Sequence, residues 1–252
     1  MIYDLLFGFY EKTTNFIKDK INNYFETKPE KGLVEKNVFL FGEHLFFFTL
    51  GICCFGNESW LYDITMMWDS KISFSVCLYY YLYITRYVVQ TKQLLPDDKE
   101  YYTYLAHHVS TISLLSLSFF RQSRIGIIIA ILHDVVDLFL LPAKICHRYY
   151  ETRELEILNY LSYLMFIVFV PIYFYTRIYI NGAIVLYLYE SKFYSLITFS
   201  NHPDFVICFY FLHLNWLIQM IWQIMIVKFL YSITTGQDAI DEKDQAYFKK
   251  KN

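Results

Sequence analysis

The fold of this chain is organised around residues 107–144, whose sequence is HHVSTISLLSLSFFRQSRIGIIIAILHDVVDLFLLPAK. Two apolar runs are joined there by a short polar link around Arg121 and Arg124. Each run is long enough for a helix that crosses a bilayer, which needs about 17 to 25 residues. Set into the two runs are five ionisable residues: His107, His108, His133, Asp134 and Asp137. Because such groups are costly in hydrocarbon, they are candidates for a functional site.

The spacing of these residues predicts which of them share a helix face. His108 lies three residues before Thr111, and His133 lies four residues before Asp137. Residues three or four apart lie on the same face of a helix. If the two runs form antiparallel helices, Asp137 comes opposite His108 and Asp134 comes opposite Thr111. We therefore expect the two helices to present one His/Asp cluster to each other.

The composition indicates a membrane protein. Of its 252 residues 56% are hydrophobic, and the mean hydropathy is +0.29. A soluble domain is usually less apolar than this, so a single polytopic membrane domain is expected. The net charge of −2 gives no basis for binding nucleic acid. The cysteines have no CxxC spacing, so neither a disulfide framework nor a zinc site is expected.

Six stretches have the length and apolar character of transmembrane helices. They are residues 38–56, 72–91, 104–120, 125–143, 155–176 and 207–231. A seventh apolar stretch, residues 178–199, is interrupted by Asn181, Gly182 and the group Glu190-Ser191-Lys192. We expect this stretch to be a re-entrant or interfacial element on the lumenal side. The predicted fold class is therefore all-α, a polytopic membrane protein with a bundle of six transmembrane helices.

The segments that flank the bundle are expected to face the cytosol. With six spans, most lysines and arginines outside the membrane fall on one side, and that side stays cytosolic. Residues 1–36 are expected to begin with an amphipathic helix on the bilayer, and a poorly ordered tail fits them equally well. Residues 37–235 would form the transmembrane domain and residues 236–252 a charged tail. The final KKKN resembles a dilysine retrieval signal, which implies the endoplasmic reticulum membrane.

The polar residues of the central stretch form three motifs, HHxxT, RxG and HDxxD followed by a lysine. They comprise His107, His108 and Thr111, then Arg124 and Gly126, then His133, Asp134, Asp137 and Lys144. Together these motifs resemble the signature of ceramide synthases, a family of the TRAM/LAG1/CLN8 (TLC) domain superfamily. The resemblance implies an enzyme that transfers a fatty acyl group from acyl-CoA to the amine of a sphingoid base. Ceramide or dihydroceramide would be the product.

The chain departs from the family's pattern at several positions. Leu141 stands where many members have a glutamate, and Val136 stands where a serine is usual. Gln219 occupies a position where histidine is frequent. The ionisable core of the signature is present, so these departures bear on substrate detail more than on activity.

The chemistry of N-acylation suggests roles for the clustered residues. A proton must leave the attacking ammonium, and the tetrahedral oxyanion must be stabilised. His107 and His108 would act as base, or as a nucleophile that forms an acyl-imidazole, and the sequence leaves both routes open. Asp134 and Asp137 would orient these histidines or bind the substrate amine. His133 would lie within the same cluster.

Three further residues are assigned to substrate binding. Thr111 lies on the face of the histidines, and Lys144 and Arg148 would meet the CoA phosphates at the cytosolic mouth. Acyl-CoA and a sphingoid base are the expected partners besides the bilayer, and no bound cofactor or metal is expected. Di-iron enzymes of the desaturase type use HxxxH and HxxHH boxes, which this chain lacks. The oligomeric state, a homo- or hetero-dimer included, stays open.

Two other functions remain as alternatives. A non-enzymatic member of the superfamily would bind lipids or assist trafficking or translocation, but such members generally lack the complete His pair with HDxxD. A fatty-acid elongase would carry HxxHH, and the first position of that box is Tyr104 here. His44, alone in the first predicted span, is interpreted as a packing residue.

Overall fold

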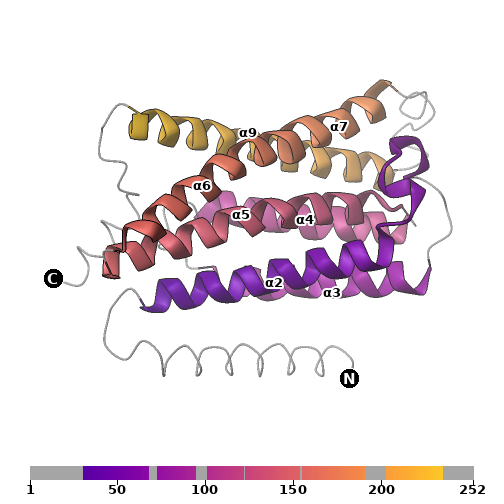
Figure 1. Ribbon diagram of the computed structural model, residues 1–252. Helices are drawn as coiled ribbons and strands as arrows, with labels where there is room; N and C mark the ends of the chain where they lie inside the picture. Colours follow the sequence, from indigo (N-terminus) through magenta and orange to yellow (C-terminus); the bar gives the residue numbers. More distant parts are fainter. Residues whose placement is uncertain are drawn as a thin grey trace.

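The computed structural model describes residues 31–67, 73–94, 101–121, 123–153, 155–190 and 203–234. Within these ranges the chain is helical and contains no strand. The expected amphipathic helix at the N-terminus and the charged C-terminal tail with KKKN lie outside the described residues. Long helices follow one another in alternating directions, so that the start of α2 and the end of α9 lie at the same end of the molecule (Figure 1).

The elements follow the apolar stretches of the sequence closely. The bundle contains α2 (Lys31–Phe55), α3 (Phe74–Lys92), α4 (Tyr101–Phe120), α5 (Ile125–Arg153), α6 (Glu156–Tyr173), the π-helix η3 (Phe174–Ile180), α7 (Asn181–Glu190) and α9 (Pro203–Thr234). Two short 3₁₀ helices, η1 (Ser59–Leu61) and η2 (Ile64–Met66), lie in the connection from α2 to α3.

The helix α5 occupies the centre of the bundle. It packs extensively against both α2 and α6, and it also contacts α3, α4 and η3. Its first two turns are apolar all round, and the side chains from Ile127 to Ile131 are all buried. A helix that is apolar on every face belongs in a core. This position lets residues on different faces of α5 reach different neighbouring helices.

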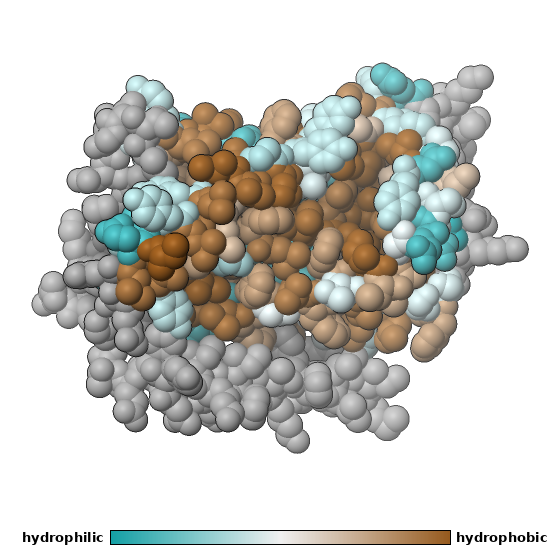
Figure 2. Space-filling view, in the orientation of Figure 1, coloured by the Kyte–Doolittle hydropathy of each residue, from teal (hydrophilic) through white to brown (hydrophobic). Residues whose placement is uncertain are grey.

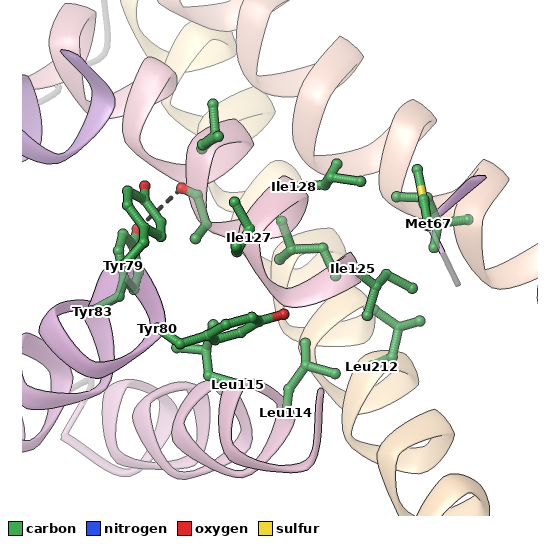
Figure 3. Close-up of a cluster of buried hydrophobic side chains, with 14 of the residues drawn as sticks. Met67, Tyr79, Tyr80, Tyr83, Leu114, Leu115, Ile125, Ile127, Ile128 and Leu212 are labelled. Atoms are coloured by element: carbon green, nitrogen blue, oxygen red, sulfur yellow. Dashed lines mark hydrogen bonds between the residues drawn. The ribbon is translucent and has the colours of Figure 1, made fainter. Parts of the chain in front are cut away.

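Tyrosines of α3 donate hydrogen bonds to the backbone of α5 and of the residues just before it, and Figure 3 shows these tyrosines in the core. The hydroxyl of Tyr80 donates to the carbonyl of Ser123 at 2.7 Å, and the hydroxyl of Tyr83 donates to that of Ala130 at 3.0 Å. Tyr80 also explains the glycine of the RxG motif. A Cβ atom on Gly126 would lie 2.8 Å from Tyr80 Cε1, so only glycine allows this close approach of α5 to α3.

Among the described residues, four helices are long and apolar enough to cross a membrane. They are Val34–Phe55, Ile125–Glu151, Glu156–Glu190 and Val206–Ser232. The helices α3 and α4 are rich in tyrosine, serine and histidine, and these residues lower their hydropathy although each helix has about 20 residues. The outer surface of the bundle carries broad apolar regions (Figure 2). Exposed side chains such as Leu164, Ile167, Leu217 and Ile221 belong to this surface, as expected for contact with lipid.

Predicted boundaries differ from the structure at three places. The first helix, α2, begins at Lys31, seven residues before the first predicted span and within the segment predicted to precede the domain. Residues 178–190 continue the fifth predicted span as η3 and α7, and residues 191–199 lie outside the described part. Asn181 and Gly182 do not interrupt the helix, because Asn181 is buried and Gly182 packs against the ring of Trp216. The fourth predicted span also continues past residue 143, since α5 runs through Pro142 to Arg153.

Candidate functional site

Histidines from two helices meet at the centre of the bundle. The ring centroids of His107 on α4 and His133 on α5 lie 5.8 Å apart, with an angle of 21° between the rings. The ring of Trp222 from α9 contacts His107 at 5.0 Å, edge to face. Tyr87 from α3 contacts both His107 and His108, at 6.1 Å and 5.2 Å. All three imidazoles are buried, as is Tyr87.

A hydrogen bond to Thr91 orients His108. The hydroxyl of Thr91 donates to the carbonyl of Tyr87 at 2.6 Å, because a carbonyl can only accept. The same hydroxyl oxygen lies 3.0 Å from His108 Nδ1, so it accepts a hydrogen from that nitrogen. This assignment, inferred from the bonding pattern, leaves Nε2 of His108 with a lone pair. In its neutral form His108 can therefore accept a proton or attack a carbonyl carbon through Nε2.

His133 is fixed through both ring nitrogens. Its Nδ1 donates to the carbonyl of Ile129 at 2.7 Å, one turn earlier on α5. Its Nε2 therefore accepts from the amide nitrogen of Gln219 on α9, at 3.2 Å. The amide oxygen of Gln219 in turn accepts from Tyr173 at 2.9 Å and from Arg177 at 3.3 Å. Gln219, which departs from the family's pattern, thus holds His133 in one tautomer.

An asparagine that the sequence analysis did not single out joins the histidine group. Asn215 on α9 is 1% exposed, and its amide nitrogen donates to the hydroxyl of Thr111 at 3.0 Å. The same nitrogen lies 3.5 Å from His107 Nδ1, a long contact. Thr111, predicted to lie beside the histidines, is therefore within the site.

The carboxylate of Asp134 lies in a buried ionic group between α2, α3 and α5. Its Oδ1 accepts from Arg86 Nη1 at 2.8 Å and lies 2.7 Å from His44 Nδ1. The guanidinium of Arg86 also pairs with Glu43, with 2.7 Å between Nε and Oε1. Buried charges of this kind are stable only when paired. The other oxygen of Asp134, Oδ2, is buried and has no hydrogen-bond partner among the described residues.

Asp137 pairs with Arg177 of the π-helix η3. The distance between Arg177 Nη2 and Asp137 Oδ2 is 3.0 Å, and the same nitrogen donates to the carbonyl of His133 at 2.7 Å. Arg177 therefore connects the carboxylates to the histidine group. Single π-helical turns occur frequently at functional sites, and this one follows Pro171, which cannot donate a backbone hydrogen bond.

The residues of the predicted cluster converge, but their pairing differs from the expectation. His133 is the residue of α5 that faces α4, where it meets His107. Asp134 does not face Thr111, since it turns to His44 and Arg86. Asp137 does not pair with His108 either: it binds Arg177, while His108 binds Thr91.

Lys144 and Arg148 lie away from this cluster. Lys144 is exposed about two turns beyond Asp137 on α5, roughly 10 Å along the axis. Arg148 is one turn further and pairs with Glu151 at 3.0 Å. Contact of these two residues with CoA phosphates stays a prediction.

Four ionisable residues of the site were missed or misinterpreted, and Arg177 is one of them. His44 was interpreted as a packing residue, yet it lies against both Asp134 and Asp137, at 2.7 Å and 3.7 Å. Glu43 and Arg86 were not considered. The available signal was the charge itself, because Glu43 and Arg86 stand within otherwise apolar runs, where ionisable residues usually serve a function.

Comparison with known proteins agrees with the motifs. The model of the TLC domain matches residues 34–228. A ceramide synthase of Caenorhabditis elegans, hyl-1, is 25% identical over 228 residues, which cover 82% of this chain and 59% of that protein. Human ceramide synthase 4 is 28% identical over 206 residues, 77% of this chain and 48% of that protein.

A plant relative is more similar over a shorter region. Ceramide synthase LOH2 of Arabidopsis thaliana is 36% identical over 97 residues, 35% of this chain and 33% of that protein. The chain thus spans about half the length of the curated relatives that it matches over most of its own length. Since the domain model covers more than three quarters of the sequence, this chain belongs to the TLC domain family.

Proposed function

We propose that this protein is a ceramide synthase, which transfers a fatty acyl group from acyl-CoA to the amine of a sphingoid base. The observation that carries the proposal is the meeting of His107, His108 and His133 in one buried group, joined to Asp137 through Arg177. Membership in the TLC domain family and the names of the relatives support the same activity.

The reaction requires a base or nucleophile with a free ring nitrogen. His108 meets this requirement, because its bond to Thr91 leaves Nε2 with a lone pair. In one route this nitrogen accepts a proton during attack of the amine on the thioester. In the other it attacks the thioester itself, and the acyl-imidazole then passes the acyl group to the amine. The neighbouring His107 fits either role as well.

Asn215 is suited to stabilise the oxyanion of the tetrahedral intermediate. One of its amide hydrogens is used by Thr111, and the other makes only a long contact with His107 Nδ1. An amide donor held in place by a buried hydrogen bond stabilises negative charge without rearranging during the reaction. We assign the oxyanion contact to Asn215 Nδ2.

The six-span topology belongs to this proposal. The helices α3 and α4 lie beside the four more apolar helices and run in alternating directions with them (Figure 1). Six passes place the start of α2 and the end of α9 on one side, and the distribution of lysine and arginine favours the cytosol for that side. The endoplasmic reticulum membrane is the location that fits the KKKN end and this activity.

The proposal is tested with purified protein in lipid nanodiscs. The protein is incubated with sphinganine and a panel of acyl-CoAs of different chain lengths, and lipid products are identified by mass. The expected product is the N-acylated sphinganine of at least one acyl-CoA, with one free CoA thiol released for each amide formed. Binding of sphinganine without any product would instead support the non-enzymatic alternative.

A further inference from the structure

His44 is one of the most accessible ionisable groups of the site. Its side chain is 15% exposed and that of Asp137 is 21% exposed, whereas His107, His108 and His133 are all below 9%. A substrate that approaches from outside the bundle therefore meets His44 and Asp137 before it meets the other histidines.

The surroundings of His44 are those of a proton acceptor. Its Nδ1 lies 2.7 Å from Asp134 Oδ1 and 3.7 Å from Asp137 Oδ2. Nδ1 thus lies beside an acceptor, Asp134 Oδ1, and beside a donor, Arg86 Nη2 at 2.8 Å. We assign its hydrogen to the shorter contact, the one with Asp134, and this assignment is part of the inference. The other ring nitrogen, Nε2, then has a lone pair, and it has no hydrogen-bond partner among the described residues.

Charged groups of four elements surround this imidazole. Asp134 and Asp137 of α5 place negative charge beside it, and Arg86 of α3, whose Nη2 lies 2.8 Å from Nδ1, places positive charge there. Glu43 of α2 pairs with Arg86 and offsets part of its charge. Arg177 of η3 is bound to Asp137 and offsets part of the negative charge of that carboxylate. The two carboxylates nearest to His44 thus each have a guanidinium partner that fixes their position.

A second observation points to a cationic ligand at the same place. Asp134 is completely buried, and its Oδ2 has no hydrogen-bond partner among the described residues. A buried carboxylate oxygen without a donor is unfavourable. An ammonium group carries three N–H donors and a positive charge, so it would satisfy this oxygen and bind Asp137 as well.

We propose that His44 is the residue that removes the proton from the ammonium group of the sphingoid base, while Asp134 and Asp137 hold this amine beside it. This inference rests on the proposed function. The amine gives one proton to His44 Nε2 and then attacks the thioester carbon with its free electron pair. As the C–N bond forms and the C–S bond breaks, the second proton leaves nitrogen and goes to the CoA thiolate. His44 finally gives its proton to water.

The site is thereby divided between two groups of residues. His44 and the carboxylates take the amine, and His107, His108 and His133 remain for the acyl thioester. Arg177 lies between the two groups, since its Nη2 binds both Asp137 and the carbonyl of His133. Both routes of acyl transfer fit this division, because each requires a neutral amine. In the direct route His108 passes the second proton from the amine to the CoA thiolate. In the other route the C–S bond has already broken, and the amine displaces His108 from the acyl carbon, after which His108 takes the second proton and gives it to the thiolate.

The variant His44→Asn tests this assignment. Asparagine can still donate a hydrogen bond to Asp134 from the position of Nδ1, but it cannot take up a proton. Without an internal base the reaction depends on the amine that is already neutral in solution, and this fraction rises about tenfold per pH unit below the amine's pKa. We expect kcat/KM for sphinganine to fall strongly at neutral pH. It should then rise about tenfold for each pH unit, in step with the fraction of neutral amine. The wild-type profile should be nearly level over the same range.

His213→Asn is the matched control. His213 of α9 is also an imidazole within the bundle, but its Nδ1 binds the carbonyl of Phe209 on its own helix. It lies on the face of α9 opposite Asn215. This variant should keep the wild-type activity and pH profile.

The outcomes separate the two claims. A tenfold recovery per pH unit in His44→Asn, with an unchanged KM for acyl-CoA, supports the role of His44 and shows that the variant is folded. Full activity at neutral pH, or an equal loss at every pH, overturns that role while wild-type product formation upholds the ceramide synthase proposal. Absence of product from the wild type at every pH overturns both.

Discussion

Arg86 Nη1 lies 2.8 Å from Asp134 Oδ1, in an ion pair whose two side chains are 2% and 0% exposed. Removing one partner of such a pair leaves an uncompensated buried charge. We expect Arg86→Met to lower the free energy of unfolding by about 3 to 5 kcal/mol. Denaturant titration in one detergent provides the measurement.

Two further variants show whether breaking this buried ion pair is the cause of the lower stability. In the double variant Arg86→Met/Asp134→Asn neither charge remains, so it should be more stable than Arg86→Met alone. Arg148→Met removes an arginine from its pair with Glu151, whose side chain is 39% exposed, and it should cost less than about 1 kcal/mol. If Arg86→Met and Arg148→Met lowered the free energy of unfolding equally, burial of the Arg86–Asp134 pair would not explain the loss.

Gly126 is predicted to be required for the contact between α5 and α3. A methyl group there would lie 2.8 Å from Tyr80 Cε1 and 2.9 Å from its hydroxyl oxygen, and Tyr80 is fully buried. Gly126→Ala should therefore lower stability by about 1 to 3 kcal/mol. In Gly42→Ala, where no atom lies within 4 Å of the new Cβ, stability should be unchanged or higher by up to about 1 kcal/mol. Thermal unfolding of both variants decides this, and equal melting temperatures would refute the steric explanation.

The hydroxyl of Thr91 should matter for activity through His108. Thr91→Val removes the acceptor for His108 Nδ1–H, so we expect kcat to fall by about tenfold or more while the protein stays folded. Thr91→Ser keeps the hydroxyl and should restore most of the activity. Thr85→Val is the control, because Thr85 makes the same bond to its own helix, to the carbonyl of Tyr81, at an exposed position. Steady-state kinetics with sphinganine and one acyl-CoA measure all three, and a loss in Thr85→Val as large as in Thr91→Val would exclude the proposed role.

Asn215 should contribute mainly to the transition state. Because its amide is assigned to the oxyanion, Asn215→Leu should lower kcat by about 10² to 10³ and change the KM for acyl-CoA little. Asn159→Leu is the matched control, because Asn159 is a partly exposed residue in the first turn of α6, and it should leave kcat at the wild-type value. A rise in KM with kcat unchanged in Asn215→Leu would assign this residue to substrate binding instead.

The sequence predicts well what depends on one helix alone. Spacing placed Thr111 beside the histidines of its own helix, and the structure puts it there, bound to Asn215. Within the described residues, apolar length predicted the long helices but not η1, η2 or the continuation of the fifth span as η3 and α7. Gly182 was predicted to interrupt a helix, but its role is close packing against Trp216, and a sequence does not distinguish these two uses of glycine.

The sequence did not predict which residues of other helices pair with the residues of α5. Asp134 meets Arg86 and His44, which lie 48 and 90 residues away in the chain. Spacing tells which residues share a face of α5, but it does not tell which neighbouring helix covers that face. Because α5 is central, His133 faces α4 while Asp134 faces α2 and α3. A single hairpin of two helices could not predict this arrangement.

The central claim is that the pooled imidazoles and carboxylates carry out acyl transfer. It is tested most directly by comparing wild type, His108→Ala and Asp137→Asn for the formation of N-acyl sphinganine by mass, with thermal unfolding measured on the same samples. The account predicts product from the wild type and at least a hundredfold loss in both variants, with the fold retained. Full activity in both variants would contradict it.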